Sequence, residues 1–302
     1  MNSYALFVLV ALLADYVLQC VADLFNLRAL DRPLPSTVAP LYAVGEHERA
    51  RRYVRTVTVA GFVERSVGLL AILSFWLLGG FSWLDVIVRQ TLSGELARGL
   101  AYIGSLALAY MALGIPFDVH RTFVVESRFG FNRTTGRTFV VDRLKGLALT
   151  AAIGGPLLAG VLLLFLRMGT SAWLLCWLGV VAFSLLTQWL GPALILPLFN
   201  RFEPMPDGEL RNAILAYACS VHFPVENLYI MDGSRRSSKA NAYFTGLGRK
   251  KRIALFDTLI SRYSVGEVVA VLAHEVGHFK RRHVVKGMLL GAAHTGLALF
   301  LL

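Results

Sequence analysis

The chain has 302 residues; 56% of them are hydrophobic, 16% are charged, and the mean hydropathy is +0.60. These values exclude an ordinary soluble globular protein, since soluble domains carry roughly 45–50% apolar and about 25% charged residues. The formal net charge of +11 also fits a nucleic-acid-binding protein, but the basic residues gather in particular connections between apolar segments. We therefore predict an integral membrane protein whose partner is the lipid bilayer and not a nucleic acid.

Six stretches approach or exceed the length of about 20 apolar residues that crosses a bilayer as a helix. They cover residues 4–24, 59–78, 100–117, 147–166, 172–198 and 284–302. The first has no basic residues before it and is interrupted by Asp15, so we expect a retained helix and not a cleaved signal peptide. Ionisable groups are costly at membrane depth. We therefore expect Asp15 to face a hydrated interior, and Asp23 and Arg65 to lie at the interface.

The positions of Lys and Arg predict the orientation of these spans. Residues 26–55 contain six arginines, and residues 118–145 contain five arginines and one lysine. The other two connections carry only Arg89 and Arg98, and Arg167. Because basic connections face the cytoplasm, we expect the N-terminus outside the cell and the long segment after the fifth span inside it.

Residues 126–135 form part of the third connection and have the composition of an ordered turn. Gly130 is flanked by Phe129 and Phe131 and is followed by Asn132, a pattern typical of a turn and not of a flexible linker. The residues alone favour a surface loop whose phenylalanines lie at the membrane.

Residues 199–283 are more polar and are predicted to form a small α+β lobe on the cytoplasmic face. A helix is expected over residues 207–218, a strand over 227–231, and a hairpin from residues 241–245 and 252–256. The first strand of this hairpin contains Asn241, Ala242 and Tyr243. We hypothesise that its edge holds an extended substrate by main-chain hydrogen bonds. An ordinary strand of a sheet fits these residues equally well.

The end of this lobe contains the pattern H-E-x-x-H, and Ser264 and Glu267 form a capping-box sequence at the start of its helix. His274 and His278 are four residues apart, so on a helix both imidazoles can bind one metal ion. Glu275 lies about 100° round the helix from His274, where it can act as general base on a zinc-bound water. We predict one Zn²⁺ ion, with His274 and His278 as ligands and Glu275 as the catalytic base.

The other histidines show no comparable spacing. His283 lies five residues after His278, away from the ligand side of a continuous helix, so we do not expect it to bind zinc. His47, His120 and His222 are expected to be structural or exposed.

Five motifs together resemble those of the type I CAAX prenyl proteases, a family of integral-membrane zinc endopeptidases. The motifs are ESRFGFN at 126–132, PLFNRF at 197–202, DGSRRSS at 232–238, NAYFTG at 241–246 and HEVGH at 274–278. The resemblance implies cleavage of a possibly prenylated peptide near a C-terminal CAAX sequence, inside a hydrated chamber walled by the spans. It also implies that His274 and His278 bind zinc, that Glu275 is the base, and that Asn241 and Ala242 lie on the substrate-binding strand.

The chain departs from this family in one respect. The family has seven spans and takes its third zinc ligand, a Glu, from a helix after them, whereas residues 279–302 contain neither Asp nor Glu. A catalytic zinc usually has three protein ligands and a water. We therefore expect a C-terminally truncated chain; a partner, an upstream residue or His294 are the other possible sources of the third ligand.

The predicted architecture is mostly α, a polytopic α-helical membrane protein with a small α+β zinc-metallopeptidase lobe. Residues 1–198 form a membrane domain with five spans and basic cytoplasmic loops, residues 199–283 form the cytoplasmic peptidase lobe, and residues 284–302 form a sixth span. The high content of Arg relative to Lys favours a bacterial inner membrane, with the ER membrane as the eukaryotic alternative; the zinc site is expected on the cytoplasmic side.

Two other functions also fit the sequence. The first is a membrane quality-control protease of the HtpX type, although that family places its site after two spans and this chain has five before the motif. The second is a catalytically silent, truncated fragment that only binds peptides.

Overall fold

The computed structural model describes residues 2–42, 45–245 and 251–301. It divides into two compact units, Met1–Asn132 and Arg133–Leu302, which are described separately. Among the described residues, six helices are long and apolar enough to cross a membrane. These are Ser3–Leu30, Glu46–Leu77, Glu95–Glu126, Gly136–Met168, Ala172–Phe199 and His283–Leu301. Each overlaps one of the six predicted spans, so the prediction of a polytopic α-helical membrane protein is confirmed.

The helices are longer than the predicted spans. The second begins at residue 46 and not at 59, and the third continues to residue 126 and not to 117. Much of the two basic connections is therefore helical, which the apolar pattern of the sequence does not predict. The physical reason is that charged residues end an apolar segment but do not end a helix, because Arg, Lys and Glu are good helix formers.

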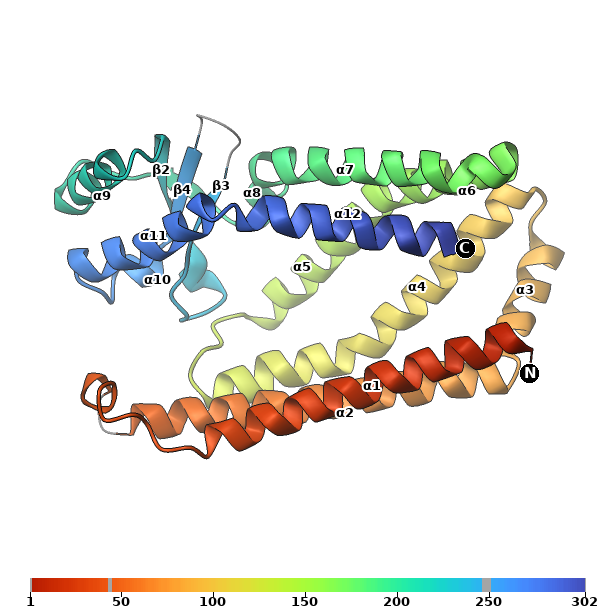
Figure 1. Ribbon diagram of the computed structural model, residues 1–302, viewed down its shortest axis with the longest axis horizontal. Coiled ribbons are helices and arrows are strands. Elements are labelled where there is room, and N and C mark those ends of the chain that lie inside the picture. Colours follow the sequence, from red (N-terminus) through yellow and green to blue (C-terminus); the bar gives the residue numbers. More distant parts are fainter. Residues whose placement is uncertain (1, 43–44, 246–250, 302) are drawn as a thin grey trace. The chain divides into compact units, whose positions relative to one another are not determined.

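In the first unit, α1 (Ser3–Leu30) and α2 (Glu46–Leu77) run side by side, followed by α3 (Gly80–Thr91) and α4 (Glu95–Val119), which continues as a π-helix to Glu126 (Figure 1). Asp23 of α1 and Arg65 of α2 form an ion pair. Charged side chains in membrane-spanning helices usually pair with one another in this way.

The turn after α4 is ordered, as predicted, but its aromatic side chains pack against α2. The rings of Phe129 and Phe131 meet the ring of Tyr53 edge-on, with centroids 5.2 and 5.1 Å apart. The Tyr53 hydroxyl donates to Glu126 Oε1 at 2.6 Å, and Gly130 has a φ of +73° that favours glycine. Phe129 is buried, so the favoured interpretation of phenylalanines lying at the membrane surface is wrong for this residue.

The second unit combines membrane helices with a four-stranded sheet (Figure 1). Its helices are α5 (Gly136–Leu149), α6 (Gly155–Met168), α7 (Ala172–Leu194), α8 (Leu196–Phe199), α9 (Glu209–Ser220), α10 (Asp257–Ile260), α11 (Val265–Lys280) and α12 (His283–Leu301). Its strands are β1 (Phe202–Pro204), β2 (Val225–Met231), β3 (Ala242–Thr245) and β4 (Lys251–Phe256). A π-helical segment, Thr150–Gly154, joins α5 to α6.

The strands are ordered β1-β2-β4-β3, with β2 and β4 parallel and both outer pairs antiparallel. One face of the sheet forms a core with α9 and α11, in which Ile214, Ile253, Leu255 and Leu272 are almost fully buried. The predicted helix, strand and hairpin of this lobe are therefore confirmed, while residues 246–250 of the hairpin turn lie outside the described residues. β1 was missed, because three residues ending in proline give no alternating pattern.

Gly233, at the turn after β2, lies against the ring of Phe256. An added Cβ would lie 2.9 Å from Cγ and 3.0 Å from Cε2 of that ring. We therefore expect Gly233→Ala to destabilise the lobe by about 1–3 kcal/mol through overpacking, measured as a lower thermal unfolding temperature in detergent. Gly266→Ala is the control, because nothing lies within 4 Å of its Cβ position. Equal unfolding temperatures for the two variants would contradict this expectation.

Candidate metal centre

A capping box stabilises the N-terminus of the helix α11, and the apolar side of the helix packs against the core. The Ser264 amide donates to Glu267 Oε2 at 2.8 Å, and Ser264 Oγ accepts from the Glu267 amide at 3.5 Å. Hydrogen bonds from the Ser264 hydroxyl and then its amide lower the pKa of Glu267. Val268, Leu272 and Val276 are buried in the core. The predicted capping box is confirmed, and it fixes the orientation of the helix.

His274 and His278 converge on one point. Their Nε2 atoms lie 3.0 Å apart, and their ring centroids lie 4.7 Å apart. Two ligand nitrogens on a tetrahedral zinc, each at about 2.0–2.1 Å, would be separated by about 3.3 Å. The pair therefore fits a zinc ion after a shift of a few tenths of an ångström. Glu275 lies between them in sequence and is partly buried.

A third ligand is not brought to this pair by the described residues. Across residues 2–42, 45–245 and 251–301, no group of three or more His, Cys, Asp or Glu side chains could hold a metal ion. Neither His294 nor an upstream residue thus completes a three-ligand site there. The structure brings together two of the three ligands that a catalytic zinc usually has.

His283 contacts His278, which the spacing of these residues does not predict. Their Nδ1 atoms lie 2.8 Å apart. The expectation that His283 lies apart from the site assumed a continuous helix, whereas α11 ends at Lys280 and Arg282 adopts a φ of +55°. The contact depends on the backbone turn after α11, and residue spacing alone does not reveal such a turn.

The strand that carries Asn241, Ala242 and Tyr243 is at the edge of the sheet. β3 pairs with β4 on one side, and no other described strand pairs with it. The Phe256 amide donates to Asn241 O at 3.0 Å, while the Ala242 amide donates to Asn241 Oδ1 at 2.9 Å. Since alternate amides of an antiparallel strand face opposite sides, the Ala242 amide points to the open edge. The strand also contacts α11.

Tyr243 lies on the other face of the strand from Ala242. Its ring meets that of Phe256 edge-on with centroids 6.4 Å apart, and its hydroxyl lies 3.5 Å from Met231 Sδ. Burial raises the pKa of Tyr243 to about 12. Tyr243 is therefore a neutral, partly buried side chain and not a candidate acid or base.

Arg236 connects the lobe to the membrane helices of its unit. Its Nε and Nη2 atoms donate to the two carboxylate oxygens of Asp142 on α5, at 2.7 and 3.0 Å. Nη1 donates to Asn200 Oδ1 at 2.9 Å, and Nη2 donates to Phe199 O at 2.7 Å. The hydrogen bond to Asp142 raises the pKa of Arg236. The sequence alone does not reveal this role of Arg236, because nothing in a Ser/Arg-rich loop indicates a partner 94 residues away.

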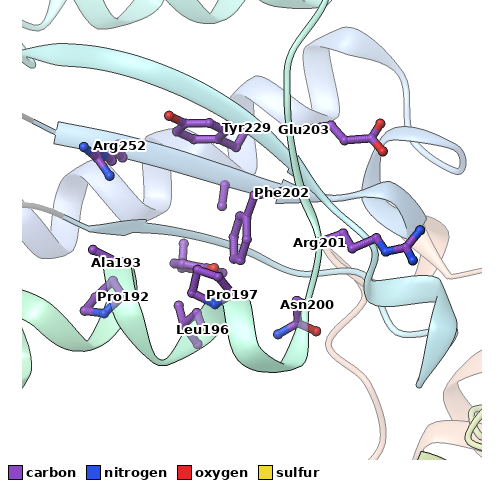
Figure 2. A pocket seen from close by; sticks show the side chains of 12 residues that line it. Pro192, Ala193, Leu196, Pro197, Asn200, Arg201, Phe202, Glu203, Tyr229 and Arg252 are labelled. Carbon is purple, nitrogen blue, oxygen red and sulfur yellow. The ribbon is translucent and has the colours of Figure 1, made fainter.

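A cavity of about 510 Å³ lies between the end of α7, α8 and the sheet (Figure 2). Its lining residues are Pro192, Ala193, Leu196, Pro197, Asn200, Arg201, Phe202, Glu203, Tyr229, Tyr243, Arg252 and Ala254. Tyr229 and Tyr243 are both register partners of Ala254 and so share one face of the sheet. Ile253 and Leu255, on the opposite face, belong to the core beside α11. The cavity is therefore on the other side of the sheet from the candidate metal centre.

Two family models together match almost the whole described chain. Residues 23–201 match the model for the CAAX prenyl protease N-terminal region with five membrane helices, and residues 204–302 match peptidase family M48. The chain belongs to the CAAX prenyl protease group of peptidase family M48. This confirms the resemblance drawn from the five sequence motifs, and with it a membrane metallopeptidase family.

Individual relatives agree with this assignment. The chain is 36% identical over 277 residues to the CAAX prenyl protease 1 homolog of Arabidopsis thaliana, which covers 89% of this chain and 65% of the relative. It is 39% identical over 213 residues to CAAX prenyl protease 1 of Saccharomyces cerevisiae, covering 70% and 47%. The chain thus spans about half to two-thirds of the length of these curated relatives.

A solved structure supports the fold. The crystal structure of S. mikatae Ste24p superposes with a TM-score of 0.88 at 31% identity, covering 98% of this chain and 72% of that one. The predicted fold class, a mostly α-helical membrane protein with a small α+β peptidase lobe, is therefore confirmed.

Proposed function

We propose that this protein is a zinc-dependent endopeptidase of the membrane that cleaves peptides near a C-terminal CAAX-type sequence. The observation that carries the proposal is the convergence of the His274 and His278 Nε2 atoms, 3.0 Å apart, on a capped helix that contacts β3, the edge strand of the sheet. Family membership and the names of the relatives support the CAAX specificity. The domain boundaries at residues 198 and 283 and the cytoplasmic position of the zinc site belong to this proposal.

In this proposal Glu275 and the zinc ligands divide the chemistry. A zinc ion held by His274 and His278 supplies Lewis-acid activation of water and of the scissile carbonyl. Glu275 accepts the proton of the attacking water and then delivers it to the leaving amine. Its place next to His274, on the same rigid helix, fixes its distance from the reacting atoms.

The open edge of β3 would hold the substrate. A peptide added there as a further strand would accept a hydrogen bond from the Ala242 amide. That amide is bound by the side chain of Asn241, which must turn away when the peptide arrives. The Asn241 side chain therefore accepts the hydrogen bond of the Ala242 amide while no peptide is bound, and releases this amide when a peptide binds. Tyr243 forms part of the opposite face of the strand.

Cleavage of defined peptides by the purified full chain tests this function. We expect a prenylated peptide ending in a CAAX sequence to be cut near its C-terminus, with the position determined by mass spectrometry. A zinc chelator should abolish cleavage and added Zn²⁺ should restore it, because the ion supplies Lewis-acid activation. The matched control is the same peptide with a scrambled C-terminus; an unprenylated CAAX peptide shows whether the lipid is required.

Two results would contradict the proposal in different ways. Cleavage of unfolded membrane proteins without preference for a CAAX end would favour the quality-control protease. Peptide binding without cleavage, even with zinc present, would favour the catalytically silent fragment.

A further inference from the structure

Both ring nitrogens of His278 have a partner. Nε2 lies 3.0 Å from Nε2 of His274, and Nδ1 lies 2.8 Å from Nδ1 of His283. The rings of His278 and His283 meet edge-on, with centroids 4.9 Å apart and planes inclined by 74°. The geometry is that of a hydrogen bond between two imidazoles in which one nitrogen donates and the other accepts.

The chain reaches this contact through an unfavourable turn. α11 ends at Lys280, Arg282 adopts a left-handed φ of +55°, and α12 begins at His283. On a continuous helix, His283 would be turned by about 140° from His278. Left-handed backbone is disfavoured for a residue with a Cβ, and helices that end this way usually use glycine. The turn therefore places His283 beside His278 where an uninterrupted helix would separate them.

We propose that His283 is a positioning residue that orients His278 toward the metal ion. This inference rests on the proposed function, in which His278 binds zinc through Nε2. Metal-binding histidines almost always donate their second N–H to an acceptor, which fixes both the tautomer and the ring orientation. With zinc on Nε2, His278 would carry its proton on Nδ1 and donate it to His283 Nδ1, which lies 2.8 Å away.

The same geometry explains why His283 is not itself a ligand. It lies on the Nδ1 side of the His278 ring, whereas His274 lies on the Nε2 side. An acidic residue often fills the orienting role, but residues 279–302 contain no Asp or Glu. The turn instead provides the neutral imidazole of His283, whose Nδ1 lone pair can accept a hydrogen bond from His278.

Zinc affinity of the full chain in detergent, measured by competition with a chromogenic chelator, tests the inference. We expect His283→Leu, which removes the acceptor, to weaken zinc binding by about 10–100-fold. His283→Asn places a carbonyl oxygen close to the position of Nδ1, so affinity should stay within about threefold of wild type. His294→Leu, which removes another histidine of α12, is the matched control and should leave affinity unchanged. The visible spectrum of bound Co²⁺ should change only for His283→Leu.

The variants separate positioning from folding. Arg282→Gly keeps His283 and relieves the left-handed strain, so it should retain zinc affinity. Wild-type affinity in His283→Leu would overturn the inference, as would an equal loss in His283→Asn, because a purely packing role would make both changes harmful. If wild type and His278→Ala bind zinc equally poorly, the proposed metal centre itself fails. If they differ while His283→Leu matches wild type, only the role of His283 fails.

Discussion

Replacement of Glu275 by Gln is expected to lower kcat/KM for a CAAX peptide by about 10²–10⁴-fold. Gln keeps the size and polarity of the side chain but cannot take a proton from the attacking water. Zinc content should not change, because the proposed ligands are His274 and His278, and Glu275 lies about 100° round the helix from His274. The measurement pairs peptide kinetics with the zinc content of the same purified sample.

Glu267→Gln is the matched control for this change. It makes the same substitution on the same helix, at the capping box. We expect a small loss of stability and normal cleavage. Cleavage retained by Glu275→Gln would exclude Glu275 as the base, whereas joint loss of zinc and activity would indicate a structural role.

Replacement of Arg236 by Met is expected to lower the free energy of unfolding by about 2–4 kcal/mol, because it leaves the carboxylate of Asp142 without its bidentate partner. Both side chains are about one-quarter exposed, which places the effect below that of a fully buried pair. The change also removes the hydrogen bonds to Asn200 and to Phe199 O. Thermal unfolding in detergent measures the loss.

A double-mutant cycle separates the pair from its surroundings. Asp142→Leu alone should also destabilise, while the double variant Asp142→Leu, Arg236→Met should be more stable than the sum of the single effects predicts. Arg211→Met is the matched control, because its partner Asp207 is 93% exposed. Its effect should stay below about 1 kcal/mol. An equally small loss of unfolding free energy for Arg236→Met would show that the Arg236–Asp142 contact does not stabilise the lobe.

Local sequence signals predicted much of this protein. Apolar length located the six spans, the Ser264–Glu267 capping box located the start of α11, and four-residue spacing brought His274 and His278 together. Alternation and turn residues identified the strand that carries Asn241 to Tyr243, although its substrate role stays a proposal. All of these depend on residues that lie close together in the sequence.

The features that were missed depend on distant partners or on backbone geometry. The Arg236–Asp142 pair joins residues 94 positions apart, and no pattern in either segment specifies the other. The contact of His283 with His278 depends on a single left-handed residue, Arg282. Helix ends beyond the apolar segments were missed because charged residues continue a helix as readily as they end a membrane span.

The parallel pairing of β2 with β4 has a consequence for biogenesis. Parallel neighbours cannot form by closing a tight turn, so β2 can pair with β1 at once but its pairing with β4 must wait until residues 251–256 have left the ribosome. Arg236 lies in the intervening segment, and its partner Asp142 belongs to a helix synthesised much earlier. We therefore expect the bilayer-embedded helices to be inserted first, so that Asp142 offers an anchor on which the lobe of residues 199–283 then assembles.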